Sequence, residues 1–178
     1  MKAHWENIYS NKKFEDVSWY QKKPETSLEF IMSLKLEKNA RILDMGGGDS
    51  FLVDFLLAEG FTDITVADIS EKALERAKKR LGKNAEKIKW VVTDASKFSP
   101  SEEFDLWHDR AAFHFLAERV QLNNYLHILH KALRPGGYVV LGTFSEEGPA
   151  KCSGIEIKQY SIKEMQDVVG NNYTTTNC

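Results

Sequence analysis

The sequence predicts an α/β fold in which helices cover both faces of a doubly wound, mostly parallel sheet. Short apolar runs alternate along the chain with segments whose apolar residues recur at intervals of three and four. The apolar runs lie at residues 42–45, 64–68, 88–93, 104–108 and 138–144. An aspartate stands at the carboxyl end of each of the first three, and a glycine triplet follows the first. Alternating strands and helices of this kind favour crossover units and therefore a parallel sheet.

The composition indicates one globular domain over residues 1–178. Hydrophobic residues make up 42% of the chain and charged residues 28%, which is enough for a real core. The net charge of −2 gives no basic footprint for nucleic acid, although a local patch stays open. Cys152 and Cys178 have no metal-ligand spacing and favour a reducing compartment. No run approaches the ~18 apolar residues of a membrane span, so we expect a cytoplasmic protein without a metal centre or a membrane partner.

The stretch that organises the chain is residues 41–50, Arg-Ile-Leu-Asp-Met-Gly-Gly-Gly-Asp-Ser. Its apolar residues suit a buried strand, and the glycines allow positive φ angles and a close approach of the backbone to a ligand. The spacing of Phe51, Phe55 and Leu56 predicts a helix directly afterwards. A strand, a glycine turn and a helix N-terminus together form a ligand cradle at the carboxyl edge of the sheet.

The spacing within this cradle discriminates between ligands. A dinucleotide fingerprint needs a third small residue three positions after Gly48, where this chain has Phe51. The pattern Asp44-x-Gly46-x-Gly48-x-Ser50 instead resembles motif I, (D/E)xGxGxG, of class I S-adenosylmethionine (SAM) dependent methyltransferases, with Ser50 in place of the last glycine. SAM carries an ammonium, a sulfonium and no phosphate, so an acidic cradle suits it. A purely structural turn is the alternative interpretation.

Two further aspartates fit a nucleoside. Asp68, followed by Ile69, lies 22 positions after Gly46, where a carboxylate can accept hydrogen bonds from ribose hydroxyls in both NAD-binding and SAM-binding folds. The family resemblance assigns Asp94 and Ala95 to adenine recognition, whereas the bland alternative is that Asp94 caps a turn. Ser70 predicts the start of a helix that runs to Leu81.

The end of the fourth strand is the expected acceptor side. His108 and Asp109 are candidate catalytic residues, because histidine takes up protons near neutral pH, and Asp109 or Arg110 can orient an anionic substrate. His108 is also a candidate ligand contact. The Asn/Asp-Pro-Pro-Tyr sequence of amine-methylating relatives is missing here, which argues against nucleobase amines and glutamine. His114 lies between two phenylalanines, so packing is the favoured interpretation for it.

A second resemblance lies further along the chain. A helix over 125–133, the sequence Leu-Arg-Pro-Gly-Gly at 133–137 and a strand over 138–144 are similar to the same family. The resemblance covers residues 41–144 and implies a Rossmann-like SAM-binding core of the class I type. Residues 145–178 are expected to form a substrate-side loop, a helix from Ser161 to Val169 and a possible sixth strand at 173–176. Strands six and seven would be incomplete, which suggests a truncated chain or a homodimer through that edge.

Aromatic residues are concentrated in residues 1–27. The spacing of Trp5 and Tyr9, with Trp19 and Tyr20 later, resembles the N-terminal lid that closes over the methionine end of SAM in many family members. Tyr20 is therefore a candidate pocket residue. A capping helix packed on the sheet is the alternative, especially for Trp5. A further helix is predicted over residues 25–36.

Taken with the resemblance, these features imply a SAM-dependent methyltransferase that releases S-adenosylhomocysteine. The implied reaction is direct in-line displacement by an acceptor oxygen, nitrogen or sulfur, and the acceptor is expected to be a small molecule. A protein lysine methyltransferase and a non-catalytic SAM-binding partner subunit remain as alternatives, while Phe51 disfavours a nicotinamide dehydrogenase. The expected cofactor-binding residues are Tyr20, Asp44, Gly46, Gly48, Ser50, Asp68, Ile69, Asp94, Ala95 and His108.

Overall fold

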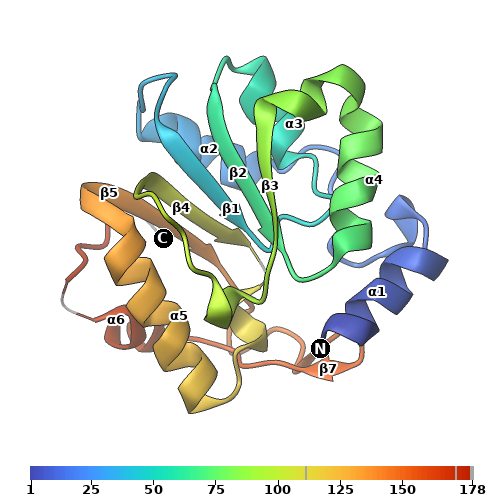
Figure 1. Ribbon diagram of the computed structural model, residues 1–178. Helices are drawn as coiled ribbons and strands as arrows, with labels where there is room; N and C mark the ends of the chain where they lie inside the picture. Colours follow the sequence, from blue (N-terminus) through green and yellow to red (C-terminus); the bar gives the residue numbers. More distant parts are fainter. Residues whose placement is uncertain (111, 171, 177–178) are drawn as a thin grey trace.

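A five-stranded parallel sheet forms the centre of the molecule (Figure 1). The computed structural model describes residues 1–110, 112–170 and 172–176. The strand order is β3-β2-β1-β4-β5, so the chain reverses its direction of travel between β1 and β4. The doubly wound parallel fold predicted from the sequence is confirmed. The strands are β1 (Arg41–Met45), β2 (Asp63–Asp68), β3 (Ile88–Val92), β4 (Phe104–Arg110) and β5 (Leu133–Gly142).

Helices cover the two faces of the sheet because successive strand residues point to opposite sides. Ile42 packs in a cluster with helices α2 (Glu25–Ser33), α3 (Leu52–Ala58) and α4 (Glu71–Leu81). Leu43, its neighbour, packs in the opposite cluster with α5 (Arg119–Ala132) and α6 (Ile162–Val169). The parity of a strand residue therefore decides which helices its side chain meets.

Helix caps fix where two of these helices begin. The Ser70 hydroxyl accepts a hydrogen bond of 3.2 Å from the backbone N–H of Ala73, which starts α4. Ser161 and Glu164 form a reciprocal capping box at the start of α6. The sequence predicted that helices start at both serines, and both predictions are confirmed.

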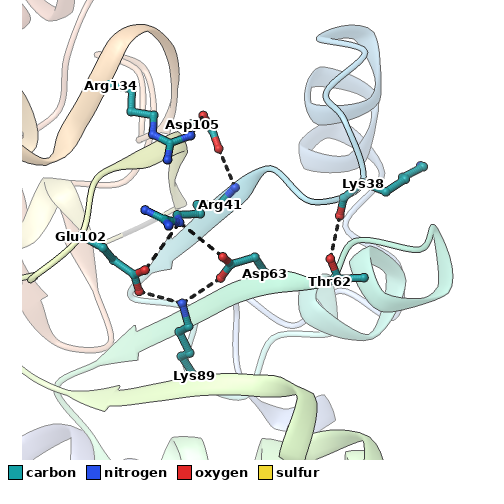
Figure 2. A network of polar contacts seen from close by, with 8 residues as sticks. All are labelled: Lys38, Arg41, Thr62, Asp63, Lys89, Glu102, Asp105 and Arg134. Atoms are coloured by element: carbon teal, nitrogen blue, oxygen red, sulfur yellow. Dashed lines mark hydrogen bonds and ion pairs between the residues drawn. The ribbon is translucent and has the colours of Figure 1, made fainter.

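A network of charged side chains ties together the amino ends of the strands (Figure 2). Lys89 lies 2.9 Å from Asp63 and 2.8 Å from Glu102, and Arg41 lies 3.4 Å and 3.6 Å from the same two carboxylates. The backbone N–H of Arg41 also donates to Asp105 at 2.7 Å. These contacts join the amino ends of β1, β2 and β3 to the segment that leads into β4.

The N-terminal segment lies across that carboxyl edge. Helix α1 (Lys2–Asn11) and a short hairpin of β6 (Lys151–Cys152) and β7 (Ile155–Glu156) run below the strand tips in Figure 1. Trp5 and Ile8 of α1 are buried against Val17, and the Trp5 ring meets Phe115 edge to face at 5.1 Å. The predicted aromatic segment is therefore packed over the strand ends.

Several element boundaries differ from the sequence predictions. The helix predicted over 25–36 ends at Ser33, and the helix predicted over 125–133 already begins at Arg119. The strand predicted over 104–108 continues to Arg110, because Asp109 and Arg110 pair with β5. The possible sixth strand at 173–176 is wrong: the segment does not pair with the sheet, and the ring of Tyr173 stacks on His130 of α5 at 5.3 Å.

Within the described ranges, no helix combines the length and apolarity needed to cross a bilayer. Cys152 is buried and carries a free thiol, whereas Cys178 lies outside the described residues. In the part of the chain that the structure describes, no three histidine, cysteine or acidic side chains are grouped as metal ligands would be.

Candidate functional site

A cavity opens at the carboxyl edge of the sheet, between the strand tips and α1. Its wall combines polar side chains from β1 to β4 with aromatic rings from α1 and the loop after β4. The lining residues that the sequence had singled out as ligand contacts are Asp44, Gly46, Ser50, Asp68, Ile69, Asp94, Ala95 and His108. Residues far apart in the sequence thus meet in one place, since the carboxyl ends of parallel strands share an edge.

The glycine turn is shaped by close contacts on both sides. Gly46 has φ +71°, and its backbone N–H donates to the carbonyl of Ala67 at 2.7 Å. A Cβ added at Gly46 would lie 2.4 Å from the Cβ of Ala112, so only glycine fits where the loop after β4 crosses the turn. Arg80 of α4 supports the turn from outside, with guanidinium hydrogen bonds of 2.7 Å to the carbonyls of Asp49 and Ser50.

Asp44 and His108 are bonded to each other across β1 and β4, where they are register partners. The Asp44 carboxylate oxygen Oδ1 lies 2.7 Å from His108 Nδ1, and His108 Nε2 lies 3.0 Å from the hydroxyl of Ser27 in α2. All three residues are buried. A carboxylate accepts hydrogen bonds only, so Nδ1 carries the proton in this bond. Asp44 and His108 therefore form one polar unit at the point where the strand order reverses.

Asp68 is a buried carboxylate at the tip of β2. Its Oδ1 accepts a hydrogen bond of 2.7 Å from the backbone N–H of Ser70. Burial raises the pKa of Asp68 to about 7, and the nearby carboxylates of Asp49 and Asp44 add to the rise. The ring of Tyr9 reaches the same place: a Cβ on Gly48 would lie 2.9 Å from the Tyr9 hydroxyl and 3.2 Å from Asp68 Oδ2. Hydrogen-bond donors that reach Asp68 would favour its charged form.

Asp94 stands at the entrance to a single helical turn after β3. Its Oδ1 accepts hydrogen bonds from the backbone N–H and the hydroxyl of Ser96, at 2.9 and 2.7 Å. Asp94 thus caps the turn, as the bland interpretation predicts, and it also lines the cavity beside Ala95. The two roles are compatible because a carboxylate has more than one acceptor position.

Three of the predicted site residues do not line the cavity. Tyr20 packs edge to face on Phe51 at 6.1 Å. Gly48 is not in the wall, although a Cβ placed on it would meet Tyr9 and Asp68, which are. Asp109 points to the opposite face, where its carboxylate accepts hydrogen bonds from the backbone of Ala112 and Phe113 and from the hydroxyl of Tyr125. Burial raises its pKa to about 6.

The position of Asp109 favours a structural role. Asp109 and Trp107 point to the α5 side, whereas His108 points to the α2 side, because neighbours in a strand alternate. The bonds of Asp109 to Ala112 and Phe113 fix the start of the loop that presses on Gly46. Its catalytic role stays a prediction to which this geometry adds no support.

Some cavity residues were not expected from the sequence. Gln121 of α5, Cys152 of the hairpin and Met1 lie in the wall, together with Arg110 at the end of β4. Arg110 was noticed as an orienting group, but nothing local predicts that α5 and the hairpin reach the same cavity. Such contacts depend on tertiary packing, which no periodic pattern reports.

His114 packs as the sequence suggested. It is fully buried, its ring lies 4.4 Å from Phe115 and 5.2 Å from Phe144, and burial lowers its pKa to about 4. Among the described residues its two ring nitrogens have no hydrogen-bond partner. A neutral imidazole in an apolar nest fits a core residue better than a proton carrier.

Comparisons with known proteins agree with this architecture. The family model described as "Methyltransferase domain" matches residues 42–137. Nodulation protein S of Rhizobium tropici is 34% identical over 113 residues, which are 64% of this chain and 47% of that protein. Malonyl-[acyl-carrier protein] O-methyltransferase 1 of Ilyobacter polytropus is 28% identical over 76% of this chain and 49% of its own. The chain thus spans about half the length of these curated relatives.

Solved structures show the same fold. A SAM-dependent methyltransferase from Thiobacillus denitrificans in complex with S-adenosyl-L-homocysteine is 26% identical, with a TM-score of 0.57 over 72% of this chain and 52% of that one. The protein solved for "Conversion of a Disulfide Bond into a Thioacetal Group during Echinomycin Biosynthesis" has a TM-score of 0.72 over 95% of this chain and 77% of its own, at 20% identity. The family model covers more than half of the residues of this chain, which therefore belongs to the methyltransferase-domain family.

Proposed function

We propose that the protein is a SAM-dependent methyltransferase that uses a small-molecule acceptor. The observation that carries the proposal is the meeting of three aspartates, Asp44, Asp68 and Asp94, around a bare glycine turn in one cavity. Such a wall offers acceptors to an ammonium, to ribose hydroxyls and to an exocyclic amine. The solved neighbours support it, since their descriptions name SAM, sinefungin or S-adenosyl-L-homocysteine as the bound compound.

In the proposed complex, different residues of the cavity wall contact the adenine, the ribose and the methionine end of SAM. Asp94, Ala95 and Ile69 hold the adenine, and Asp68 accepts from the ribose hydroxyls. The methionine end lies against Gly46 and Ser50, with Asp44 on its ammonium. Gly48 keeps the turn open beside Asp68, and Tyr20 supports the turn from outside through Phe51. The residues fit the group because Asp44, Asp68 and Asp94 bring carboxylate acceptors for an ammonium, for ribose hydroxyls and for an exocyclic amine to the wall of one cavity.

The chemistry that SAM supplies is a methyl group already activated by a positive sulfur. The protein then has to align the acceptor in line with that methyl and keep water away. The rings of Trp5, Trp19 and Phe115 line the cavity and can exclude water. His108 holds Asp44 at 2.7 Å, and both of its ring nitrogens are engaged. We therefore propose that His108 acts through Asp44 as a positioning residue, with a proton-transfer role only after its bond to Ser27 opens.

The acceptor atom can be oxygen, nitrogen or sulfur. Names among the relatives and neighbours include a malonyl-[acyl-carrier protein] O-methyltransferase, a glycopeptide N-methyltransferase and a sugar N-methyltransferase. A small acceptor suits a cavity that α1 closes from outside. A lysine-directed enzyme and a binding subunit without catalysis are the competing functions. A cytoplasmic location and a dimer through the β5 edge remain part of the proposal.

Calorimetry with SAM, S-adenosylhomocysteine and NAD tests the cofactor. We expect the two adenosyl ligands to bind, NAD to fail, and Asp68→Ala to weaken binding by 10-fold or more, since buried hydroxyls would lose their acceptor. Asp167→Ala on the exposed side of α6 is the matched control. Methyl transfer is then sought by mass spectrometry of metabolites and proteins that gain one methyl group on incubation with SAM. Binding without any methylated product would favour the binding subunit, and tight NAD binding would overturn the proposal.

A further inference from the structure

Arg110 ends β4 at the mouth of the cavity. Its side chain is half buried and lines the cavity wall. It lies two residues beyond His108, so both side chains leave the strand on the same face. The register pairs Met45 with Asp109, which places Arg110 beside the glycine turn that follows β1. Arg110 and Asp44 therefore flank Gly46.

The guanidinium of Arg110 is poorly satisfied. Its hydrogen bond to the carbonyl of Trp19 is long, at 3.4 Å, and no carboxylate of the described residues lies within 4.0 Å of it. Arg80 and Arg134, in contrast, lie 2.7 Å and 2.8 Å from carboxylate oxygens. A guanidinium carries five donors in a planar fork that matches a carboxylate.

Electrostatics point the same way. Burial lowers the pKa of Arg110, and the nearby Asp44 and Tyr9 oppose this only through longer-range charge interactions. Asp44 is not a direct partner, because no ion pair within 4.0 Å joins its carboxylate to Arg110 among the described residues. A cation removed from water without a paired anion is costly, so an anionic ligand at this position would recover that energy.

We propose that Arg110 binds a carboxylate group in this cavity. The inference rests on the proposed function and deepens it, because two molecules in a methyl transfer can bring a carboxylate here. One is the methyl donor, whose amino-acid end carries an ammonium beside a carboxylate. Asp44 and Arg110 on either side of Gly46 match that pair of charges. The other is an acceptor that bears a carboxylate of its own.

The test compares SAM with its decarboxylated analogue, which lacks only the carboxylate. Binding of both compounds is measured by calorimetry to the parent, to Arg110→Gln and to Arg110→Lys. Arg119→Gln, at an exposed site at the start of α5, is the matched control. If the methyl donor supplies the carboxylate, Arg110→Gln weakens SAM binding about 10- to 100-fold and leaves the analogue unchanged, as expected for a charge-assisted pair. Arg110→Lys keeps the charge without the planar fork of donors, so its affinity for SAM should lie between those of the parent and Arg110→Gln.

A second arm addresses the acceptor. Acetate and malonate are titrated into the parent and into Arg110→Gln, both loaded with S-adenosylhomocysteine, with acetamide as the neutral control. Loss of carboxylate binding in the variant, with unchanged SAM affinity, assigns the carboxylate to the acceptor. Equal weakening of SAM and its analogue, or no change for any probe, would overturn the proposal. Failure of the parent to bind SAM would refute the proposed function instead. In that case, a comparison of acetate binding to the ligand-free parent and to ligand-free Arg110→Gln would still test whether Arg110 binds a carboxylate.

Discussion

The carboxylate of Glu6 in α1 accepts a hydrogen bond of 2.8 Å from the backbone N–H of Glu71, the first residue of α4. Its other oxygen accepts from the hydroxyl of Ser70 at 3.2 Å and the backbone N–H of Lys72 at 3.3 Å. A carboxylate at a helix N-terminus satisfies free N–H groups and interacts favourably with the helix dipole. Through this contact, the helix that carries Trp5 and Tyr9 is anchored to the helix that follows Asp68.

Glu6→Gln should loosen this anchor. The amide keeps one acceptor oxygen but loses the charge, so we expect the free energy of unfolding to fall by about 1 kcal/mol. Bound S-adenosylhomocysteine should leave several-fold faster, because α1 covers the cavity. Denaturant unfolding and stopped-flow displacement measure the two effects. Glu15→Gln removes a charge from the same segment at an exposed site and should change neither. A release rate equal to that of the parent would show that α1 does not gate the cavity.

The affinity for adenosyl ligands should depend on the charge of Asp68. Its pKa is raised from 3.8 to about 7 in the free protein. In the proposed function, ribose hydroxyls donate to the carboxylate form. Binding therefore releases a proton, so affinity should rise with pH and level off above about 7. Below that pH the slope approaches tenfold per unit. 5′-Methylthioadenosine is the suitable probe because it lacks the titrating amino-acid end.

The stability of the free protein should depend on pH in the opposite direction to the ligand affinity. The unfolded chain ionises Asp68 near 3.8, whereas the folded chain holds the proton to about 7, so this group makes the protein less stable as pH rises between the two values. Asp68→Asn should then be more stable than the parent at pH 8, and its weak ligand binding should not vary with pH. A parent whose affinity stays flat over the same range would refute the ribose assignment.

His108→Ala should destabilise the protein more than its size suggests. The substitution leaves the buried Asp44 charge without its donor, which costs about 3 kcal/mol. His108→Asn restores a donor near the Nδ1 position and should recover part of the loss. Ser27→Ala removes only the outer bond and should cost about 1 kcal/mol. Equilibrium unfolding in urea measures all three. Similar stabilities for His108→Ala and Ser27→Ala would mean that Asp44 does not depend on the imidazole.

Gly46→Ala should destabilise the folded protein through a steric clash with Ala112. A Cβ at Gly46 would lie 2.4 Å from the Cβ of Ala112, and the φ of +71° is strained for alanine. We expect a loss of about 3 kcal/mol, of which about 1 is backbone strain. Gly154→Ala, with φ +80° and open space around it, measures the strain alone. The double change Gly46→Ala with Ala112→Gly should return to the Gly154→Ala level. No rescue would show that the turn resists any side chain for another reason.

Local patterns predicted the fold well because they report burial directly. The three apolar runs before Asp44, Asp68 and Asp94 became β1, β2 and β3, and Ser70 and Ser161 became caps. Boundaries that depend on tertiary contact were harder. The threonines after Tyr173 have high strand propensity, but a strand needs a partner. Instead, Tyr173 stacks on His130 of α5, and Thr175 accepts a hydrogen bond from Gln166 of α6.

The site was predictable where strand parity and spacing decide it. Asp44, Asp68 and Asp94 line one cavity because their strands end at one edge. Asp109 was harder to assign, since residue type suggested chemistry while its place one position after His108 turned it to the other face. Ser27 gave no signal in the sequence, because its bond to His108 joins residues 81 positions apart.

The bond between Asp44 and His108 joins the half of the chain that contains β1 to β3 to the half that contains β4 and β5. In the proposed function, the half with β1 to β3 supplies the walls for the nucleoside, and the half with β4 and β5 supplies the face toward the acceptor. If the chain were cut in the loop between β3 and β4, neither fragment would hold a complete cavity. Ligand recognition would then return only when the fragments reassemble, which makes adenosyl binding a direct reporter of their docking.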